Sequence, residues 1–332
     1  MPTLVGKEVG PTGYGLMGLT WRQEIPSQEQ AFAAMKAALK NGMNFWNGGE
    51  FYGPPEYNSL VLLERYFAKY PEDADKVVLS IKGGTSADGS RPDGSPEGIR
   101  RSIDTCIAQL KGRKKIDIFE CARRDQTVPM KTTFEVIEKE YIQTGKIGGI
   151  SLSEVRAETI HEAVKITKIV AVEVELSLSS TDILENGVAD ACAQYDIPIV
   201  AYSPVGRGFF TGELKTMADI DKVSAHLRTW PRFQPENFKI NLELAQQVEK
   251  IAERKGVTPA QLAISWTKRV SSWRKGAPKT IIPIPGATTA ARVNENAVEV
   301  DITDAEMAEL DATLAKFPPA GERYPAAIPS NT

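Results

Sequence analysis

The sequence predicts an α/β fold in which eight short parallel strands close into a barrel with helices around the outside, the (β/α)8 or TIM-barrel architecture. Short apolar runs alternate regularly with longer amphipathic stretches along the chain. This alternation implies parallel pairing, because each return of the chain to a parallel neighbour requires a crossover, usually a helix. The length of 332 residues suits one such barrel, so we expect residues 1–332 to form a single domain.

The expected strands are short apolar runs, and glycine-rich or polar residues separate them from the next helix. They are Gly15–Leu19, Met43–Trp46, Val77–Ile81, Ile116–Phe119, Ile147–Ser151, Ile169–Val174, Ile197–Ala201 and Thr280–Ile284. The opening segment LVGKEVGPTGYG predicts an N-terminal β-hairpin that caps one end of the barrel.

The expected helices are amphipathic stretches between these strands. They are Ser27–Lys40, Glu56–Lys69, Ser95–Leu110, Met130–Gln143, Arg156–Lys165, Leu184–Gln194, Leu242–Trp266 and Thr289–Asn296. Ser27 and Ser95 are suitable N-caps, and Thr258 followed by Pro259 is a further helix start. The strand-free segment 204–240 is too long for a passive connector, so we expect long loops at the C-terminal face, over the barrel mouth.

Composition excludes several classes of function. The formal net charge is −3 and the pI about 5.7, which argues against nucleic-acid binding. We expect no membrane association, because no apolar run approaches the roughly 20 residues that span a bilayer. The N-terminus lacks the pattern of a signal peptide.

The cysteines and histidines argue against disulfides and metal sites. Cys106, Cys121 and Cys192 are odd in number and far apart, so free thiols in a reducing, cytoplasmic environment are expected. His161 and His226 are the only two histidines, and no zinc-binding spacing is present. We therefore expect no metal.

One glycine motif resembles a dinucleotide fingerprint but lacks its context. Gly13, Gly15 and Gly18 spell G-x-G-x-x-G, yet a Rossmann fingerprint must open directly into a helix. Here a further stretch intervenes before Ser27, and Pro26 blocks an earlier helix start. A hairpin and first strand explain the glycines better.

Five segments together resemble the aldo-keto reductase family. In chain order they are NFWNGGEFYG, VVLSIKGG, GKIGGISLSE, AYSPVGRGFFTGEL and IIPIPGATTAARVNENAVEVDIT. The likeness spans nearly the whole chain. Within the family, FWNGGEFYGPPEYNS, DIFECARRD and PRFQPENF resemble the fungal pyridoxal reductase branch. The resemblance implies NADPH/NADP+ as cofactor and an aldehyde as substrate.

The resemblance implies that Tyr52 is the catalytic acid and Lys82 its partner. A lysine ammonium within about 4–6 Å stabilises a phenolate, so we expect Lys82 to lower the pKa of Tyr52 by ~2 units. Taken singly, Tyr52 is as well explained by packing on Pro54, and Lys82 by a solvated strand end. Taken together in this context, they favour catalysis.

Two departures from the family pattern concern the site. Asn47 stands where the family has an aspartate, and we expect it to bond Lys82 while leaving that lysine less strongly held as a cation. Ala122 stands at the position of the family histidine. His226 lies in the long loop, within reach of the barrel mouth in sequence terms. His161 is expected on the surface of a helix.

Arg123 is the candidate to polarise the substrate carbonyl in place of the histidine, because a guanidinium donates at any working pH. A salt bridge of Arg123 with Asp125 or Glu120 is an equally good interpretation.

The resemblance also implies the cofactor contacts. They are Thr20 and Trp21 from strand 1; Asn47; Ser153, Glu154 and Glu173 around the carboxamide; Tyr202 stacked on the nicotinamide; Ser203, Pro204, Val205 and Arg207 along the pyrophosphate; Gly286, Thr288 and Arg292 at the adenosine phosphate; and Glu295 and Asn296 at adenine. Glu173 occupies a position that usually holds glutamine.

The leading hypothesis is an NADPH-dependent oxidoreductase acting on CH–OH groups, which reduces pyridoxal to pyridoxine. Trp21, Phe51, Trp230 and Phe233 suit a flat aromatic pocket, although ordinary loop packing explains them equally well. A catalytically weak NADP(H)-binding sensor on the same fold is the alternative. A barrel hydrolase or lyase is a third. We expect a monomer or weak homo-oligomer.

Overall fold

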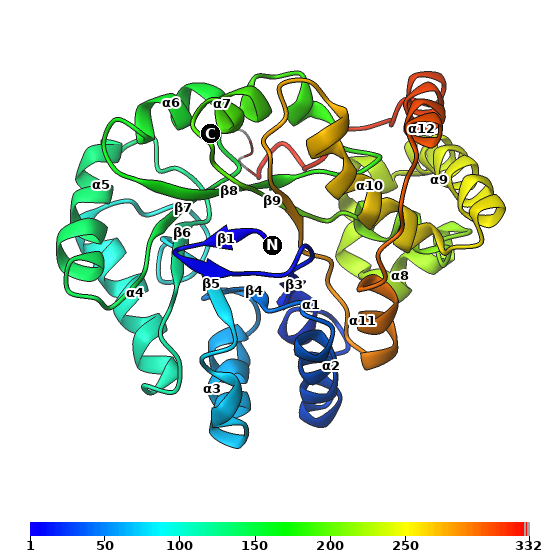
Figure 1. Cartoon of the computed structure of the whole chain (residues 1–332). Helices are drawn as coiled ribbons and strands as arrows, with labels where there is room; N and C mark the ends of the chain where they lie inside the picture. The colour runs from blue at the N-terminus through cyan, green and yellow to red at the C-terminus, as the bar shows by residue number, and fades with distance from the viewer. Residues whose placement is uncertain (329, 331–332) are drawn as a thin grey trace.

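The computed structural model, which describes residues 1–328 and 330, contains a ring of parallel strands with helices packed outside it (Figure 1). Within the described residues, eight strands pair in chain order. They are β3 (Tyr14–Gly15), β4 (Phe45–Gly49), β5 (Val78–Gly83), β6 (Ile118–Cys121), β7 (Ile150–Ser153), β8 (Ile169–Glu175), β9 (Ile199–Tyr202) and β10 (Ile281–Pro283).

Backbone hydrogen bonds join the first strand of this sheet to the last. The N–H groups of Gly13 and Gly15 donate to the carbonyls of Pro283 and Pro285, at 2.9 and 3.2 Å. A Cβ at Gly15 would lie 2.9 Å from the Ile284 carbonyl oxygen, so glycine permits this close approach. The predicted (β/α)8 fold is confirmed.

The first predicted strand, Gly15–Leu19, is wrong. Only Tyr14 and Gly15 pair as β3, and the chain then forms the short helix α1 (Met17–Thr20). Leu16 and Leu19 are both fully buried, three residues apart. A helical turn places residues with this spacing on one side, whereas a strand would place them on opposite faces.

The N-terminal segment forms a two-stranded antiparallel hairpin of β1 (Thr3–Leu4) and β2 (Lys7–Glu8). Its Leu4 and Val9 are buried in a small core with Phe45 and other residues from the starts of the barrel strands. In Figure 1 the hairpin lies across the barrel axis, with the N-terminus at the centre. The hairpin therefore lies at the end of the barrel opposite the carboxyl ends of the strands.

The longer helices surround the sheet. They are α2 (Gln28–Lys40), α3 (Ser59–Lys69), α4 (Pro96–Leu110), α5 (Met130–Val136, continued by a π-helical turn over Ile137–Ile142), α6 (Ala157–Ala163), α7 (Val188–Gln194), α9 (Pro235–Lys255), α10 (Pro259–Trp273), α11 (Ala290–Asn296) and α12 (Asp304–Lys316). The predicted caps are present: Ser27 Oγ accepts from the Gln30 N–H at 3.2 Å, and Ser95 Oγ from the Gly98 N–H at 3.0 Å.

The prediction of one helix over Leu242–Trp266 is wrong. Gly256, at φ +73°, ends α9 in the left-handed conformation, and a capping box of Thr258 and Gln261 starts α10. Helix α12 was not predicted, although Thr303 and Glu306 form a capping box at its start. The segment 204–240 contains short 3-10 turns, the short helix α8 (Ile220–Val223) and the start of α9.

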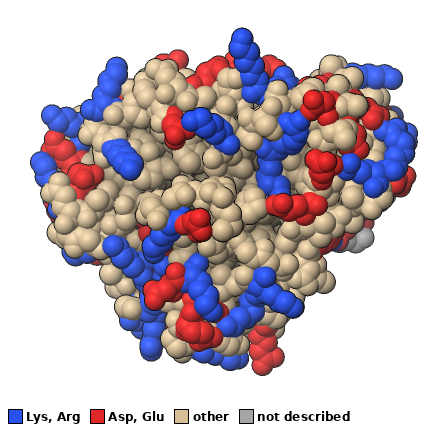
Figure 2. All heavy atoms as spheres, viewed as in Figure 1, with Lys and Arg blue, Asp and Glu red and all other residues tan. Residues whose placement is uncertain are grey.

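The hairpin face carries acidic and basic side chains that are intermingled around its periphery (Figure 2). Among the described residues, no helix combines the length and apolarity that a bilayer crossing requires. All three cysteines carry free thiols.

Candidate active site

Four polar side chains meet inside the carboxyl end of the barrel. Asn47 on β4, Lys82 on β5, Glu120 on β6 and Glu173 on β8, here called the Lys82 cluster, are each at most 4% exposed. Lys82 Nζ forms a short ion pair with Glu173 Oε1 and lies 3.2 Å from Glu120 Oε1. The amide of Asn47 donates to both carboxylates, at 3.0 Å to Glu120 and 2.6 Å to Glu173.

This cluster corrects two interpretations of the sequence. Lys82 is not a solvated strand end, and it is not weakly held: it has two carboxylate partners although position 47 carries no charge. Lys82 and Glu120 are register partners on neighbouring strands. Glu173 lies three strands away on β8 and reaches Lys82 across the barrel interior. Glu173 was expected at the cofactor carboxamide instead.

The charges of this cluster depend on one another. Burial disfavours the ammonium of Lys82, but the carboxylates of Glu120 and Glu173 outweigh that effect and raise its pKa well above the usual value. Burial and the neighbouring Glu120 carboxylate raise the pKa of Glu173, and Lys82 only partly opposes them.

Tyr52 lies in the loop after β4, against the Lys82 cluster. It is 9% exposed, and Lys82 Nζ lies 5.9 Å from the centre of its ring. Burial raises the pKa of Tyr52 to about 12, while the Lys82 ammonium acts to lower it and the two glutamates act to raise it. The expectation of a lowered pKa is therefore wrong, because burial and the two carboxylates outweigh the lysine.

Residues at the C-terminal end of α1 hold Tyr52 from the other side. Thr20 Oγ1 donates to the Tyr52 carbonyl at 2.6 Å. The ring of Trp21 stacks on that of Tyr52 with centroids 5.6 Å apart, and Phe51 packs edge-on against both. Trp21 remains 50% exposed, so the stack forms an aromatic surface open to solvent at the mouth.

Arg123 lies at the same mouth. Its guanidinium donates to the Ala122 carbonyl at 2.6 Å and lies 5.5 Å from the ring centre of Tyr324. The hydroxyls of Tyr324 and Tyr52 are among the groups whose charges act on its pKa. Arg123 therefore packs against Tyr324 at the mouth. His226 is exposed, shares a 2.7 Å hydrogen bond with Ser224, and its ring centre lies 5.8 Å from that of Trp230.

The C-terminal segment completes the mouth, which the sequence did not predict. Buried Arg323 pairs with Glu154 at 3.0 Å, Glu175 at 3.2 Å and Asp182 at 3.4 Å. Tyr324 shares a 2.6 Å hydrogen bond with the hydroxyl of Tyr202.

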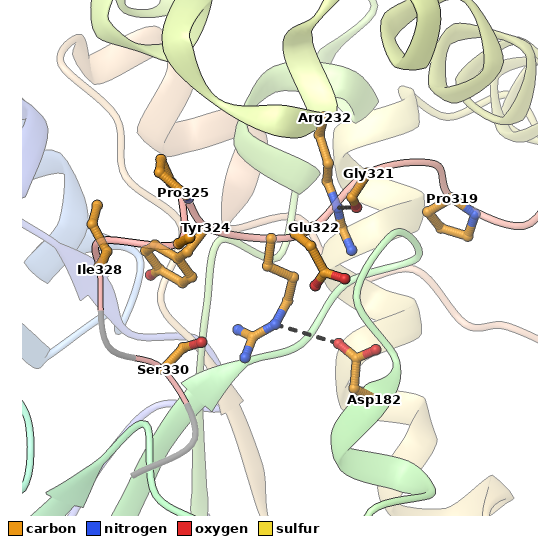
Figure 3. A pocket seen from close by; sticks show the side chains of 11 residues that line it. Asp182, Arg232, Pro319, Gly321, Glu322, Tyr324, Pro325, Ile328 and Ser330 are labelled. Atoms are coloured by element: carbon orange, nitrogen blue, oxygen red, sulfur yellow. Dashed lines mark hydrogen bonds and ion pairs between the residues drawn. The ribbon is translucent and has the colours of Figure 1, made fainter.

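Figure 3 shows this segment running past Asp182 and Arg232, beside a cavity of about 800 Å³. The tail has neither helical nor strand periodicity, so no sequence signal identified it.

Replacement of Arg323 by alanine is expected to loosen this segment. Glu154 and Glu175 would lose a buried cation, and breaking a buried pair in this way costs about 3 kcal/mol. Urea unfolding measures the change, and limited proteolysis shows whether residues after 316 become cleavable. Arg228→Ala is the matched control, because that arginine pairs with Asp221 on the surface and its loss should cost under about 1 kcal/mol. Equal unfolding free energies for the two variants would contradict the prediction.

Several predicted cofactor residues end strands in strained conformations. Glu154 after β7, Ser203 after β9 and Arg207 adopt φ of 51°, 52° and 53°. Non-glycine residues in this region cost roughly 1–3 kcal/mol each and concentrate at ligand sites. Ser153 Oγ is buried and without a hydrogen-bond partner among the described residues.

The remaining predicted residues lie on two segments. The first begins at Tyr202, the last residue of β9, and runs to Arg207. In it Pro204 is buried, Val205 is half-buried and Arg207 pairs with Glu175 at 2.8 Å. The second segment runs from Gly286 through α11. It contains Thr288, whose carbonyl accepts from Gln30, Glu295, which pairs with Arg292 at 2.6 Å, and buried Asn296. Arg292 also forms a short ion pair with Glu213, in the loop that continues beyond residue 207.

Comparison with known proteins identifies the family and agrees with this fold. Residues 11–315 match the aldo/keto reductase family, and the chain belongs to that family. A relative from Schizosaccharomyces pombe with the name "Probable pyridoxal reductase 2" is 42% identical, over 98% of this chain and 97% of its own. A relative from Saccharomyces cerevisiae, whose name also contains pyridoxal reductase, is 39% identical over 94% and 95%.

Solved structures support the fold alone. A glycerol dehydrogenase from Gluconobacter oxydans superposes with a TM-score of 0.79 at 20% identity, over 95% of this chain and 94% of its own. A thermostable aldo-keto reductase follows with a TM-score of 0.72 at 19% identity, over 94% and 98%.

Proposed function

We propose that this single-domain chain is a cytoplasmic, NADPH-dependent reductase that converts an aldehyde into an alcohol, with pyridoxal as substrate and pyridoxine as product. The observation that carries the proposal is the position of the Tyr52 phenol, buried at the barrel mouth beside the Lys82 ammonium. The names of the two yeast relatives support the choice of pyridoxal. The three free thiols fit a reducing compartment.

Tyr52 is the proposed acid. Its phenol gives a proton to the carbonyl oxygen, and Lys82 stabilises the phenolate that remains. The reduced nicotinamide supplies the hydride that the carbonyl carbon receives. In this proposal Arg123, the residue after Ala122 and packed against Tyr324 at the mouth, orients the carbonyl oxygen in place of the family histidine.

The residues present fit a nicotinamide dinucleotide. The unpartnered Ser153 hydroxyl, buried at the end of β7, offers a polar group to the carboxamide. The ring of Tyr202 suits stacking on the nicotinamide. Arg292 and the start of α11 suit a phosphate on the adenosine ribose, because guanidinium groups and helix N-termini both favour phosphate.

The aromatic surface formed by Trp21, Phe51 and Tyr52 suits a flat heteroaromatic substrate such as pyridoxal. To test this, NADPH oxidation would be followed with pyridoxal, benzaldehyde and a short aliphatic aldehyde. We expect the highest kcat/KM with pyridoxal. Equal rates with all three would remove the choice of pyridoxal but retain the reductase, whereas binding of NADPH without turnover would favour the NADP(H)-binding sensor.

Arg292→Ala is expected to raise the KM for NADPH at least about tenfold while leaving the KM for NADH nearly unchanged, since a charged hydrogen bond to phosphate contributes about 1.5–3 kcal/mol. Glu213→Gln is the matched partner variant. It removes the carboxylate that pairs with Arg292, so NADPH should bind more tightly. An equal effect of Arg292→Ala on both nucleotides would contradict the assignment.

A further inference from the structure

The Lys82 cluster contains more carboxylates than one lysine neutralises. Glu120 and Glu173 are 1% and 3% exposed, and Lys82 is the cation that both contact. Two ionised carboxylates around one ammonium would leave a net negative charge in a water-poor interior, which is costly. Closely spaced carboxyl groups relieve such a charge by retaining a proton between them.

Asn47 is matched to this pair. Its amide nitrogen donates to Glu120 and Glu173 at once, which an aspartate at position 47 would be unable to do. An aspartate there would instead add a third negative charge. The departures from the family pattern at positions 47 and 173 therefore belong together. The family carboxylate on β4 is replaced by the amide of Asn47, and the family amide on β8 is replaced by the carboxylate of Glu173.

One oxygen of the pair, Glu120 Oε2, is buried without a hydrogen-bond partner among the described residues. The other oxygen, Oε1, accepts from Asn47 and lies beside Lys82. Burial without a partner costs an ionised carboxylate more than a neutral carboxyl, so this environment favours a proton on the pair.

We propose that Glu120 and Glu173 form an acid pair that shares one proton and returns it to Tyr52 through Lys82 after each reduction. The inference rests on the proposed reductase function. Tyr52 gives its proton to the carbonyl oxygen as hydride from the reduced nicotinamide reaches the carbonyl carbon. Lys82 then gives a proton to the phenolate, and the acid pair gives its proton to the Lys82 amine. Solvent finally reprotonates the pair.

The surroundings support this assignment. Lys82 and Asn47 contact the pair directly, and Tyr52 lies beyond the lysine. Burial and the nearby charge of Glu120 raise the pKa of the Cys121 thiol. Burial and Glu120 raise the pKa of Glu173, as a shared proton requires.

Glu175, a buried carboxyl at the mouth, differs in this respect. Burial acts to raise the pKa of Glu175, but Arg207 and Arg323 outweigh it and lower that pKa. A carboxyl that titrates near neutral pH is therefore expected within the Lys82 cluster.

The direct test needs no turnover. The full chain, labelled with ¹³C at the glutamate carboxyl, is titrated by NMR from pH 4 to pH 10. We expect one carboxyl signal to move well above the usual glutamate range of about 4.3, and this signal should vanish in Glu120→Gln and in Glu173→Gln. Asp117→Asn is the matched control, because it removes a buried, lysine-paired carboxyl from the opposite end of the same strand and should leave the signal in place. Titration of every glutamate below about pH 5.5 would overturn the proposal.

Kinetics separates an acid pair from a cofactor contact. Glu173→Gln is expected to lower kcat about 100-fold, at the lower end of the usual range for proton transfer, and to remove the alkaline limb of the pH profile. The double variant Asn47→Asp, Glu173→Gln moves the negative charge from β8 to β4. It should recover part of the kcat that Glu173→Gln loses. A rise in the KM for NADPH with kcat unchanged would assign Glu173 to the carboxamide and overturn the proposal.

The two hypotheses fail differently. If no aldehyde is reduced, the reductase function fails while the NMR titration still reports on the pair. If a glutamine variant does not fold, the wild-type titration alone decides whether a carboxyl ionises near neutral pH.

Discussion

Tyr52→Phe is expected to lower kcat/KM for aldehyde reduction by about 10²- to 10⁴-fold, the range attributed to a positioned general acid. The ring stays in its stack with Trp21, so the barrel mouth keeps its shape. NADPH affinity should change less than about threefold, because the phenol acts in the transition state rather than in cofactor binding. Steady-state kinetics and fluorescence titration of NADPH measure both quantities.

Tyr57→Phe is the matched control for this substitution. The Tyr57 hydroxyl is buried and has no hydrogen-bond partner among the described residues, and the residue lies outside the Lys82 cluster. Activity should therefore be retained. If Tyr52→Phe also left turnover unchanged, Tyr52 would not be the acid, and slow turnover in both proteins would favour a nucleotide sensor.

Lys82→Met is expected to abolish reduction and to destabilise the fold. It leaves Glu120 and Glu173 buried without their cation, and removal of one partner from a buried ion pair typically costs about 3–5 kcal/mol. Free energies of unfolding in urea at pH 5 and pH 8 measure the effect.

The loss in Lys82→Met should be larger at pH 8. The pKa of Glu173 is already raised in the folded protein, and without Lys82 it would rise further. A glutamate with a raised folded-state pKa contributes stability that is full below its unfolded pKa of about 4.3 and is lost as pH rises through the folded value. Stability of the variant should thus decrease steadily from pH 5 to pH 8.

Lys36→Met is the control for the lysine substitution. Lys36 is partly exposed, and its partner Asp73 keeps Lys76 at 2.9 Å. That change should cost about 1 kcal/mol or less. A pH-independent loss in Lys82→Met equal to the loss in Lys36→Met would show that Lys82 does not neutralise a buried carboxyl pair.

The sequence predicted the elements of the fold because their causes are local. Alternating apolar and amphipathic stretches identified seven of the eight strands, with shifts of one to three residues at most starts. Ser27 and Ser95 were correct as caps because a cap needs only the following turn. The strand predicted over Gly15–Leu19 was wrong because its residues suit either a strand or a helical turn, and only the turn buries Leu16 and Leu19 on one side.

The site was only partly predictable for the same reason. Family resemblance identified Tyr52 and Lys82, and the structure brings them together. Glu120 and Glu173 were visible as carboxylates inside apolar strands, which is a signal that they have buried partners. The sequence did not reveal what those partners are. Asn47 and Glu173, for example, are 126 residues apart and meet only across the closed barrel.

The sequence by itself determined the family, the barrel, and the phenol and ammonium at its mouth. Only the tertiary structure decided the charge around Lys82, the raised pKa of Tyr52 and the closure of the mouth by Arg323 and Tyr324. Local propensity depends on neighbours along the chain, which any reader of the sequence can see. Electrostatic energy depends on neighbours in space and on their burial, and those arise only when the strands close into a ring.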